Sequence, residues 1–303
     1  MYNLLHNYLG ETAGLLTSLF YALNSVFITR AGRQVGAVVS NRTRVVFALL
    51  YLAVLNLVLF HKPLPVGAAA DRWLWLSLSG VIGLALGDAF LFQSYLSIGP
   101  RLGNLLLSLS PILAAVEAWL FLDERLGLAQ IAGIALALGG ILWVLLERSE
   151  RNGLHPSHYA RGVLFGVISA VCQATGFVFS RQGLYGSFSP LQGNAIRMLA
   201  ALAALTFIAL VQRQVRGTVE SLRAHPAALR QLMLAALVGP VIGVSFSLLA
   251  LQNAPVGVAS ILTSLTPVFL LPISFIVFKE RLKLQSILGT LVAMAGVAIL
   301  FLA

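Results

Sequence analysis

Ionisable side chains inside otherwise apolar stretches are the residues of this 303-residue sequence that could do chemistry. Four stand out: Arg44, Asp88, Glu117 and Arg197. A charge buried in the middle of a lipid bilayer costs roughly 3 kcal/mol or more, so each should have either a partner or a function. The five histidines all lie outside these stretches. If the protein binds or moves a proton within these stretches, Asp88 or Glu117 must therefore carry it.

Hydroxyl, amide and phenol groups in the same stretches are candidates for contact with a polar substrate. They are Tyr21, Asn24, Ser108, Ser110, Gln173, Thr263, Ser264 and Thr266. The hydroxyls precede Pro111 and Pro267, which lack an N–H and so leave a backbone carbonyl free. These hydroxyls could bind substrate or only repair the helix. For the amides and the phenol, the alternative is a hydrogen bond between helices.

The elements that must position these residues are predicted to be transmembrane helices. The chain is 59% hydrophobic and 10% charged, with a mean hydropathy of +0.92, which is too apolar for a soluble domain. The apolar runs do not alternate with polar residues, so they indicate a helical bundle and not a barrel. A span needs about 20 residues. The polar breaks predict ten spans, near 9–29, 37–60, 74–97, 102–121, 128–146, 160–180, 190–211, 229–251, 257–277 and 284–302. We expect the first to be retained, because no basic leader or cleavage site precedes it.

The sequence repeats itself at a fixed interval. Hydroxyls, a proline and a charged Glu-Arg turn occur at Pro111 and Glu124 and again at Pro267 and Glu280, 156 residues later in both cases (267 − 111 and 280 − 124). We therefore predict an all-α membrane protein with a first five-helix repeat at 1–147, a connection at 148–160 and a second five-helix repeat at 161–303. An odd number of spans inverts one half relative to the other, which is the plan of many secondary transporters. The charged turns themselves are predicted to cap helices and set topology.

The repeat separates matched residues from unmatched ones. Arg44 and Arg197 correspond, as do the two prolines, which predicts structural or gating roles for all four. Asp88 has Val244 opposite it and lies at the depth of Arg44 in the neighbouring span. We predict an ion pair between Asp88 and Arg44, and we keep Asp88 among the candidates for substrate contact.

Glu117 is the strongest candidate for a site that is particular to this chain. It lies seven residues after Ser110 and on the same helix face, and its counterpart in the second half is Ile273. We predict a substrate or proton site. The alternative is a structural carboxylate that stays protonated or is neutralised by an arginine, and Arg197 lies on the same side of the midplane.

These features together resemble the EamA family of the drug/metabolite transporter superfamily. The resemblance rests on two five-helix halves, an arginine early in the second helix of each (Arg44, Arg197), and a proline followed by Glu-Arg in each fourth helix. It covers nearly the whole chain. It implies a ten-helix metabolite exporter or permease with a central cavity lined mainly by helices one, three, four, six, eight and nine. It leaves the substrate open, since relatives handle amino acids, sugars, nucleotide derivatives and lipid-linked sugars.

We predict a secondary transporter, not an enzyme, that moves an amino-acid-like or similar polar or amphipathic solute by alternating access, with export as the expected direction. One alternative is a flippase for a lipid-linked sugar, which a laterally open groove would favour. A membrane-embedded enzyme of lipid metabolism would need a clustered nucleophile, an acid–base pair or a metal site, and a channel or sensor would need a polar pore stripe or a signalling domain. We predict no cofactor and no metal site. The expected setting is the inner or plasma membrane, as a multi-pass monomer or weak homodimer.

The net charge of +10 lies mostly in short connections, without the basic run that is typical of nucleic-acid binding. Odd-numbered connections hold Arg30, Arg33, Arg101, Arg148, Arg151, Arg161, Arg213, Arg216, Arg223, Arg230, Lys279, Arg281 and Lys283. Even-numbered connections hold only Lys62, Arg72, Arg125 and Arg181. The positive-inside rule then predicts that both termini face outward, whereas the family resemblance implies cytoplasmic termini.

Overall fold

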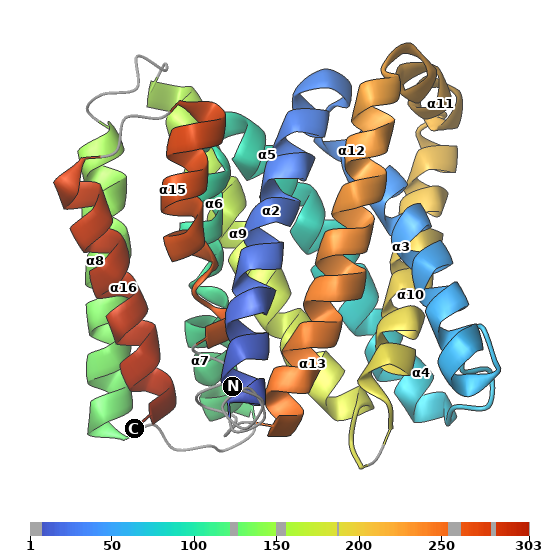
Figure 1. Ribbon diagram of the computed structural model, residues 1–303, viewed down its shortest axis with the longest axis horizontal. Coiled ribbons are helices and arrows are strands. Elements are labelled where there is room, and N and C mark those ends of the chain that lie inside the picture. Colours follow the sequence, from blue (N-terminus) through green and yellow to red (C-terminus); the bar gives the residue numbers. More distant parts are fainter. Residues whose placement is uncertain are drawn as a thin grey trace.

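The computed structural model describes residues 8–121, 127–149, 156–186, 188–253, 262–279 and 283–302, and every regular element in these ranges is helical. The helices form one bundle (Figure 1). They are α2 (Leu9–Val35), α3 (Ala37–Phe60), α4 (Ala70–Ser79), the π-helix η1 (Gly80–Gly87), α5 (Asp88–Ile98), α6 (Pro100–Leu107), α7 (Ser110–Phe121), α8 (Leu128–Ser149), α9 (Pro156–Gly183), α10 (Pro190–Val211), α11 (Val215–Ala224), α12 (Pro226–Ala236), the π-helix η2 (Leu237–Gly243), α13 (Val244–Asn253), α15 (Thr266–Phe278) and α16 (Leu284–Leu302). The Glu-Arg turns at 124–125 and 280–281 lie outside the described residues.

Seven helical segments of the described chain are long and apolar enough to cross a membrane: Leu9–Val35, Ala37–Phe60, Ala70–Ile98, Leu128–Leu146, Ser157–Gly183, Pro190–Val211 and Pro226–Ser247. Two further apolar helices, Thr266–Phe278 and Leu284–Leu300, are shorter. Large apolar side chains also cover the outside of the bundle. Val58 is 67% exposed and Phe207 is 68% exposed, as expected for side chains that face lipid. The chain is a multi-pass membrane protein.

The predicted span 102–121 is not one continuous helix. It divides into α6 and α7, which are separated by Ser108 and Leu109. The break lies just before Pro111, which then occupies the second position of α7, where a missing N–H breaks no helical hydrogen bond. Pro267 holds the same place in the first turn of α15. Both prolines therefore mark helix starts inside apolar segments.

The two π-helices, which we did not predict, lie at matched positions of the repeat. A π-helix bonds i to i+5 and leaves nearby carbonyls without their usual donors. In η1 the side-chain amide of Asn41 donates to the carbonyls of Leu84 (3.2 Å) and Ala85 (3.0 Å). In η2 the amide of Asn194 donates to the carbonyl of Pro240 (3.3 Å). The same device therefore supports both irregular segments.

Small residues let α8 and α16 approach each other closely. A Cβ atom on Gly140 would lie 2.4 Å from the backbone nitrogen of Ala293. A Cβ atom on Gly296 would lie 2.2 Å from the backbone nitrogen of Ala137. Backbone atoms cannot yield at such distances, so the contact requires glycine on both helices.

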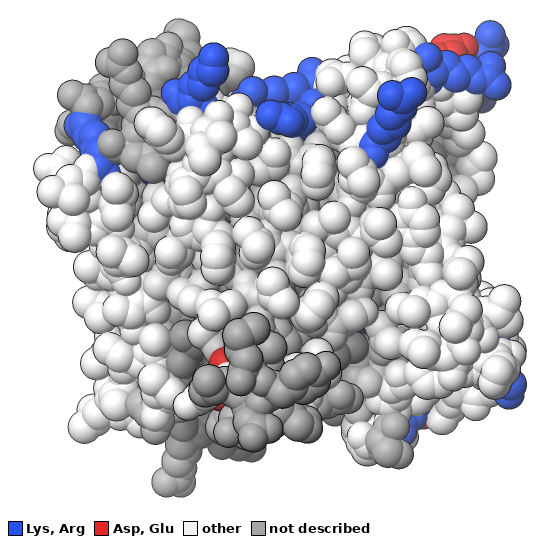
Figure 2. Space-filling view, in the orientation of Figure 1, with Lys and Arg blue, Asp and Glu red and all other residues white. Residues whose placement is uncertain are grey.

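Charge is distributed unequally between the two ends of the bundle. The beginning of α2 and the end of α16 lie at one end, and α11 lies at the other (Figure 1). Lys and Arg side chains gather at the end with α11, and fewer are visible at the opposite end (Figure 2). The exposed cations near the α11 end include Arg30, Arg33, Arg161, Arg213, Arg216, Arg223, Arg230 and Lys279. The excess of Lys and Arg in the odd-numbered connections is thus an excess of positive charge at one end of the helical bundle.

Candidate substrate site

The polar residues of the interior are arranged around α9, which packs against α4, η1, α5, α6 and α7. Gln173 and Thr175 lie two positions apart on this helix and therefore point roughly 200° apart. Gln173 faces η1 and α5, and Thr175 faces α7. The helix thus separates two polar clusters, one around Asp88 and one around Glu117.

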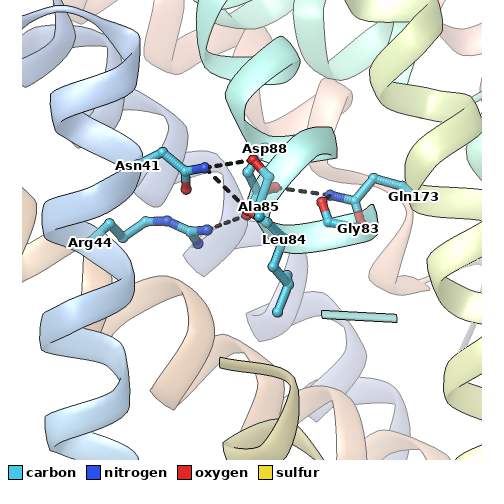
Figure 3. A network of polar contacts seen from close by, with 7 residues as sticks. All are labelled: Asn41, Arg44, Gly83, Leu84, Ala85, Asp88 and Gln173. Carbon is cyan, nitrogen blue, oxygen red and sulfur yellow. Dashed lines mark hydrogen bonds and ion pairs between the residues drawn. The ribbon is translucent and has the colours of Figure 1, made fainter. Parts of the chain in front are cut away.

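The Asp88 cluster contains the ion pair predicted from the sequence (Figure 3). Arg44 from α3 forms a salt bridge with one carboxylate oxygen of Asp88, and both side chains are buried. The side-chain amide of Gln173 donates to the other carboxylate oxygen at 2.9 Å and to the carbonyl of Gly83 at 3.3 Å. The guanidinium of Arg44 also lies over the ring of Phe92, 5.1 Å from its centroid. Both oxygens of Asp88 are therefore occupied.

Arg197, the counterpart of Arg44, has different surroundings. It interacts electrostatically with Asp88 and Tyr21, yet it has no hydrogen bond and no salt bridge within the described part of the chain. Its Nε atom is buried without a partner. Its Nη2 atom lies 3.7 Å from the position of a Cβ atom on Gly83. The two arginines occupy matched positions of the repeat, but only Arg44 is bonded to a carboxylate.

Tyr21 and Asn24 on α2 face η2. A Cβ atom on Gly243 would lie 2.7 Å from the Tyr21 ring, and one on Gly239 would lie 2.7 Å from the Asn24 amide. The side-chain oxygen of Asn24 is buried without a donor among the described residues. Glycine is required in η2 because these two side chains pack directly on its backbone. Tyr21 thereby comes within electrostatic range of Arg197.

Glu117 belongs to the second cluster. The hydroxyl of Thr175 donates to its carboxylate at 3.0 Å, and the carboxylate is only partly buried. Within the described residues Glu117 forms no salt bridge, and Arg197, which we expected on the same side of the midplane, does not neutralise it. Thr175 was not among our candidates. Its position in an apolar span, two residues from Gln173, was the available signal.

The two serine hydroxyls that precede Pro111 form local hydrogen bonds. The Ser108 hydroxyl donates to the Asn104 carbonyl at 3.1 Å, and the Ser110 hydroxyl donates to the Leu107 carbonyl at 2.7 Å. Both serines are buried. This arrangement is the one expected for helix repair at the break between α6 and α7.

The corresponding residues of the second half lie at the start of α15. Thr266 is buried, while Thr263 and Ser264 are partly buried. From α2, the Ser18 hydroxyl donates to the carbonyl of Leu262. Ser18 was not among our candidates. Its hydrogen bond connects α2 to the residues that lead into α15.

Comparison with known proteins agrees with this architecture. The sequence model of the EamA-like transporter family matches residues 8–146 and 160–302. An uncharacterised transporter of Haemophilus influenzae is 30% identical over 167 residues, which cover 54% of this chain and 52% of that protein. A WAT1-related chloroplast protein of Arabidopsis thaliana is 21% identical over 238 residues, which cover 78% of this chain and 56% of that protein.

One further relative matches a shorter part of the chain, and one solved structure matches nearly all of it at low sequence identity. A probable chloroplast anion transporter of Oryza sativa subsp. japonica is 30% identical over 127 residues, which cover 40% of this chain and 24% of that protein. The chain thus spans about half the length of the first two curated relatives and less of the third. A solved protein structure matches 96% of this chain and 95% of its own, with a TM-score of 0.60 and 15% identity, which concerns the fold alone. The match of the family model over both halves establishes that this chain belongs to the EamA-like transporter family.

Proposed function

We propose that this protein is a secondary transporter that carries a small polar or amphipathic metabolite by alternating access. Ten spans would form two inverted five-helix halves, 1–147 and 161–303. The spans would be α2, α3, α4–α5 with η1, α6–α7, α8, α9, α10, α12–α13 with η2, the segment ending in α15, and α16. The observation that carries the proposal is the Asp88 cluster. Its charged and polar groups come from α3, α5, α9 and α10, so both halves contribute to one polar centre inside an apolar bundle.

The packing of the π-helices supports a site between the halves. Helix α9 of the second half packs on η1 of the first, where Gly176 and Gly83 meet closely. Helix α2 of the first half packs on η2 of the second, where Tyr21 meets Gly243. Irregular helix segments inside a membrane are characteristic of transporter sites, and π-helical turns are frequent at functional sites. Each half thus contributes an irregular segment to the interface with the other.

Counterflow in proteoliposomes tests this function. The purified protein is reconstituted with an excess of one unlabelled solute inside, and uptake of the labelled solute is measured for a panel of amino acids, amino-acid amides, sugars and nucleosides. We expect saturable counterflow for one chemical class. Protein-free liposomes give the background, and the same panel with a pH gradient reports proton coupling. Absence of counterflow across the panel, in liposomes that contain folded protein, would contradict the proposal.

A flippase for a lipid-linked sugar is the second candidate, because one feature favours it. An apolar groove opens at the side of the bundle between α8 and α9, and its lining is formed by Leu145, Leu146, Tyr159, Ala160, Val163, Leu164 and Val167. A lipid chain could occupy such a groove while a headgroup crosses. Replacing Ala160 by Trp would fill the groove. It should abolish translocation of a fluorescent polyprenyl-linked sugar if the protein is a flippase, and should leave solute counterflow intact if it is not.

We further propose that the protein lies in the inner or plasma membrane. The end of the bundle with α11 would face the cytoplasm, because cytoplasmic connections are enriched in Lys and Arg. Export is the direction that the family resemblance implies. Proton coupling through Glu117 completes the proposal. The partial exposure of this carboxylate and its lack of a cationic partner in the described chain support the assignment.

A further inference from the structure

The two halves of the chain treat their matching arginines differently, and this difference points to a ligand. Arg44 is bonded to Asp88, while the position that corresponds to Asp88 in the second half holds Val244. Arg197 is therefore left without the carboxylate that its counterpart has. We propose that Arg197 binds the anionic group of the transported solute, so that the substrates are small monocarboxylates. This inference rests on the proposed transport function.

The charge balance of the Asp88 cluster requires such a group. Two arginines face one carboxylate, and both oxygens of that carboxylate are already engaged by Arg44 and Gln173. A guanidinium stays protonated in proteins, so Arg197 cannot become neutral by losing a proton. A lone charge inside a membrane is unfavourable unless it is paired or hydrated. One additional negative charge, supplied by the solute, would balance the cluster.

The surroundings of Arg197 leave room for a ligand. Its Nη2 atom lies against Gly83, a residue without a side chain, and Arg197 is only partly buried although it lies among α2, η1 and α10. Tyr21 lies within electrostatic range, and its hydroxyl has no hydrogen bond within the described residues. Guanidinium groups bind carboxylates with two parallel hydrogen bonds, and a nearby phenol can donate a third.

The same balance selects a singly charged group. A carboxylate brings the cluster to neutrality, whereas a phosphate carrying nearly two negative charges would leave it negative next to Asp88. Neutral amides and alcohols would leave Arg197 unpaired. The preference for an acid over its amide is therefore the property that reports on this site.

An internal carboxylate provides the sharpest test. A Cβ atom on Gly83 would lie 3.6 Å from the Gln173 Oε1 atom and 3.7 Å from both Arg197 Nη2 and the Gly176 Cα atom, which are ordinary contact distances. Gly83→Asp therefore supplies a tethered anion beside Arg197, and Gly83→Asn supplies the same shape without the charge. The probes are N-acetyl-L-leucine with N-acetyl-L-leucinamide, N-acetyl-L-phenylalanine with N-acetyl-L-phenylalaninamide, and benzoate with benzamide. Binding is followed by thermal stabilisation of the full-length protein in detergent, and transport by counterflow.

We expect the acids to stabilise the wild-type protein and to be transported in preference to the amides. Arg197→Gln and Gly83→Asp should each weaken binding of the acids by about tenfold or more, the usual loss when a charge-assisted hydrogen-bonded pair is removed. Gly83→Asn should keep the preference for acids, and Arg197→Lys should keep it in weakened form. Gly83→Asp leaves Arg197 in place, so this variant tests the assignment even if Arg197→Gln does not fold.

Two results would overturn the inference. One is a wild-type protein that binds and carries amides as well as acids. The other is equal binding of acids by Gly83→Asp and Gly83→Asn. Failure of the transport function is a separate outcome: no probe or panel solute would show counterflow, whereas the thermal measurement would still report whether acids bind at Arg197.

Discussion

Asp88 is the negative charge that Arg44 and Arg197 share. Replacing Asp88 should therefore cost a different amount of stability from replacing Arg44. Asp88→Asn keeps the size of the side chain but removes the negative charge, which leaves both Arg44 and Arg197 uncompensated. Arg44→Gln removes one cation and leaves Asp88 with its hydrogen bond from Gln173 and with Arg197 nearby. Asp88→Asn should therefore destabilise the protein more than Arg44→Gln.

The magnitudes follow from buried ion pairs in general. Removing one partner of such a pair costs about 3–5 kcal/mol, mostly because the other charge stays buried. We expect Asp88→Asn to lie near the upper end of this range. Arg44→Gln should cost roughly 2 kcal/mol, because Arg197 still offsets the carboxylate. The double variant leaves a single unpaired arginine, so it should cost at least ~1 kcal/mol less than the sum of the two single variants.

Reversible unfolding in mixed detergent micelles measures these free energies without added solute. An exposed ion pair serves as the control: Arg216 and Glu220 on α11 are 2.8 Å apart, and Arg216→Gln should change stability by only about 0.5 kcal/mol. The reasoning is refuted if Arg44→Gln costs as much as Asp88→Asn, or if the two changes are additive. Either result would mean that Arg197 does not share the charge of Asp88.

Three further predictions concern packing, coupling and orientation. Gly140→Ala should destabilise the protein by about 2 kcal/mol in the same unfolding assay, because its Cβ would meet backbone of α16, whereas Gly139→Ala, with open space around its Cβ, should be neutral or slightly stabilising. Glu117→Gln should remove the response of transport to a pH gradient while Thr175→Val only weakens transport; normal transport by Glu117→Gln at every pH and gradient would exclude proton coupling at this residue. A C-terminal alkaline phosphatase fusion should be active and a C-terminal fluorescent protein dark, because the C-terminal end of α16 lies opposite the basic face, and the reverse pattern would show that the charge rule fails here.

The class of the protein and the limits of most helices were predictable from the sequence, because apolar length and polar breaks are direct consequences of the bilayer. The breaks inside spans were less accessible. The proline at 111 predicted a loosened backbone but not a complete division into α6 and α7. The π-helical geometry of η1 and η2 had no signal beyond a set of glycines, since glycines in a span equally predict close helix packing.

Within the site, the pairing of Arg44 with Asp88 was predictable from their positions along the helices, but direction around a helix was not. Arg44 and Asp88 share a depth and do pair. Glu117 and Arg197 were also expected at one depth, yet the carboxylate bonds to Thr175 on α9. The order of the helices around the bundle decides which side chains meet. That order depends on contacts between helices, which cannot be read from the sequence. For the same reason, the matched positions of Arg44 and Arg197 suggested equal roles, although their neighbours differ.

The repeat itself indicates where specificity should lie. Asn41 and Asn194 hold matched positions and perform the same task, bonding the free carbonyls of a π-helix. If the protein is the carrier with two inverted halves that we propose, each half adopts the conformation of the other during the cycle, and shared devices of this kind serve that exchange. A solute has no such symmetry. It needs an arrangement that occurs once. Asp88 is present in only one half, opposite Val244, so only Arg44 is bonded to a carboxylate, and Glu117 has no counterpart either. Differences between relatives in substrate should therefore map to the unmatched positions, while substitutions at the matched asparagines should slow the carriage of every substrate alike.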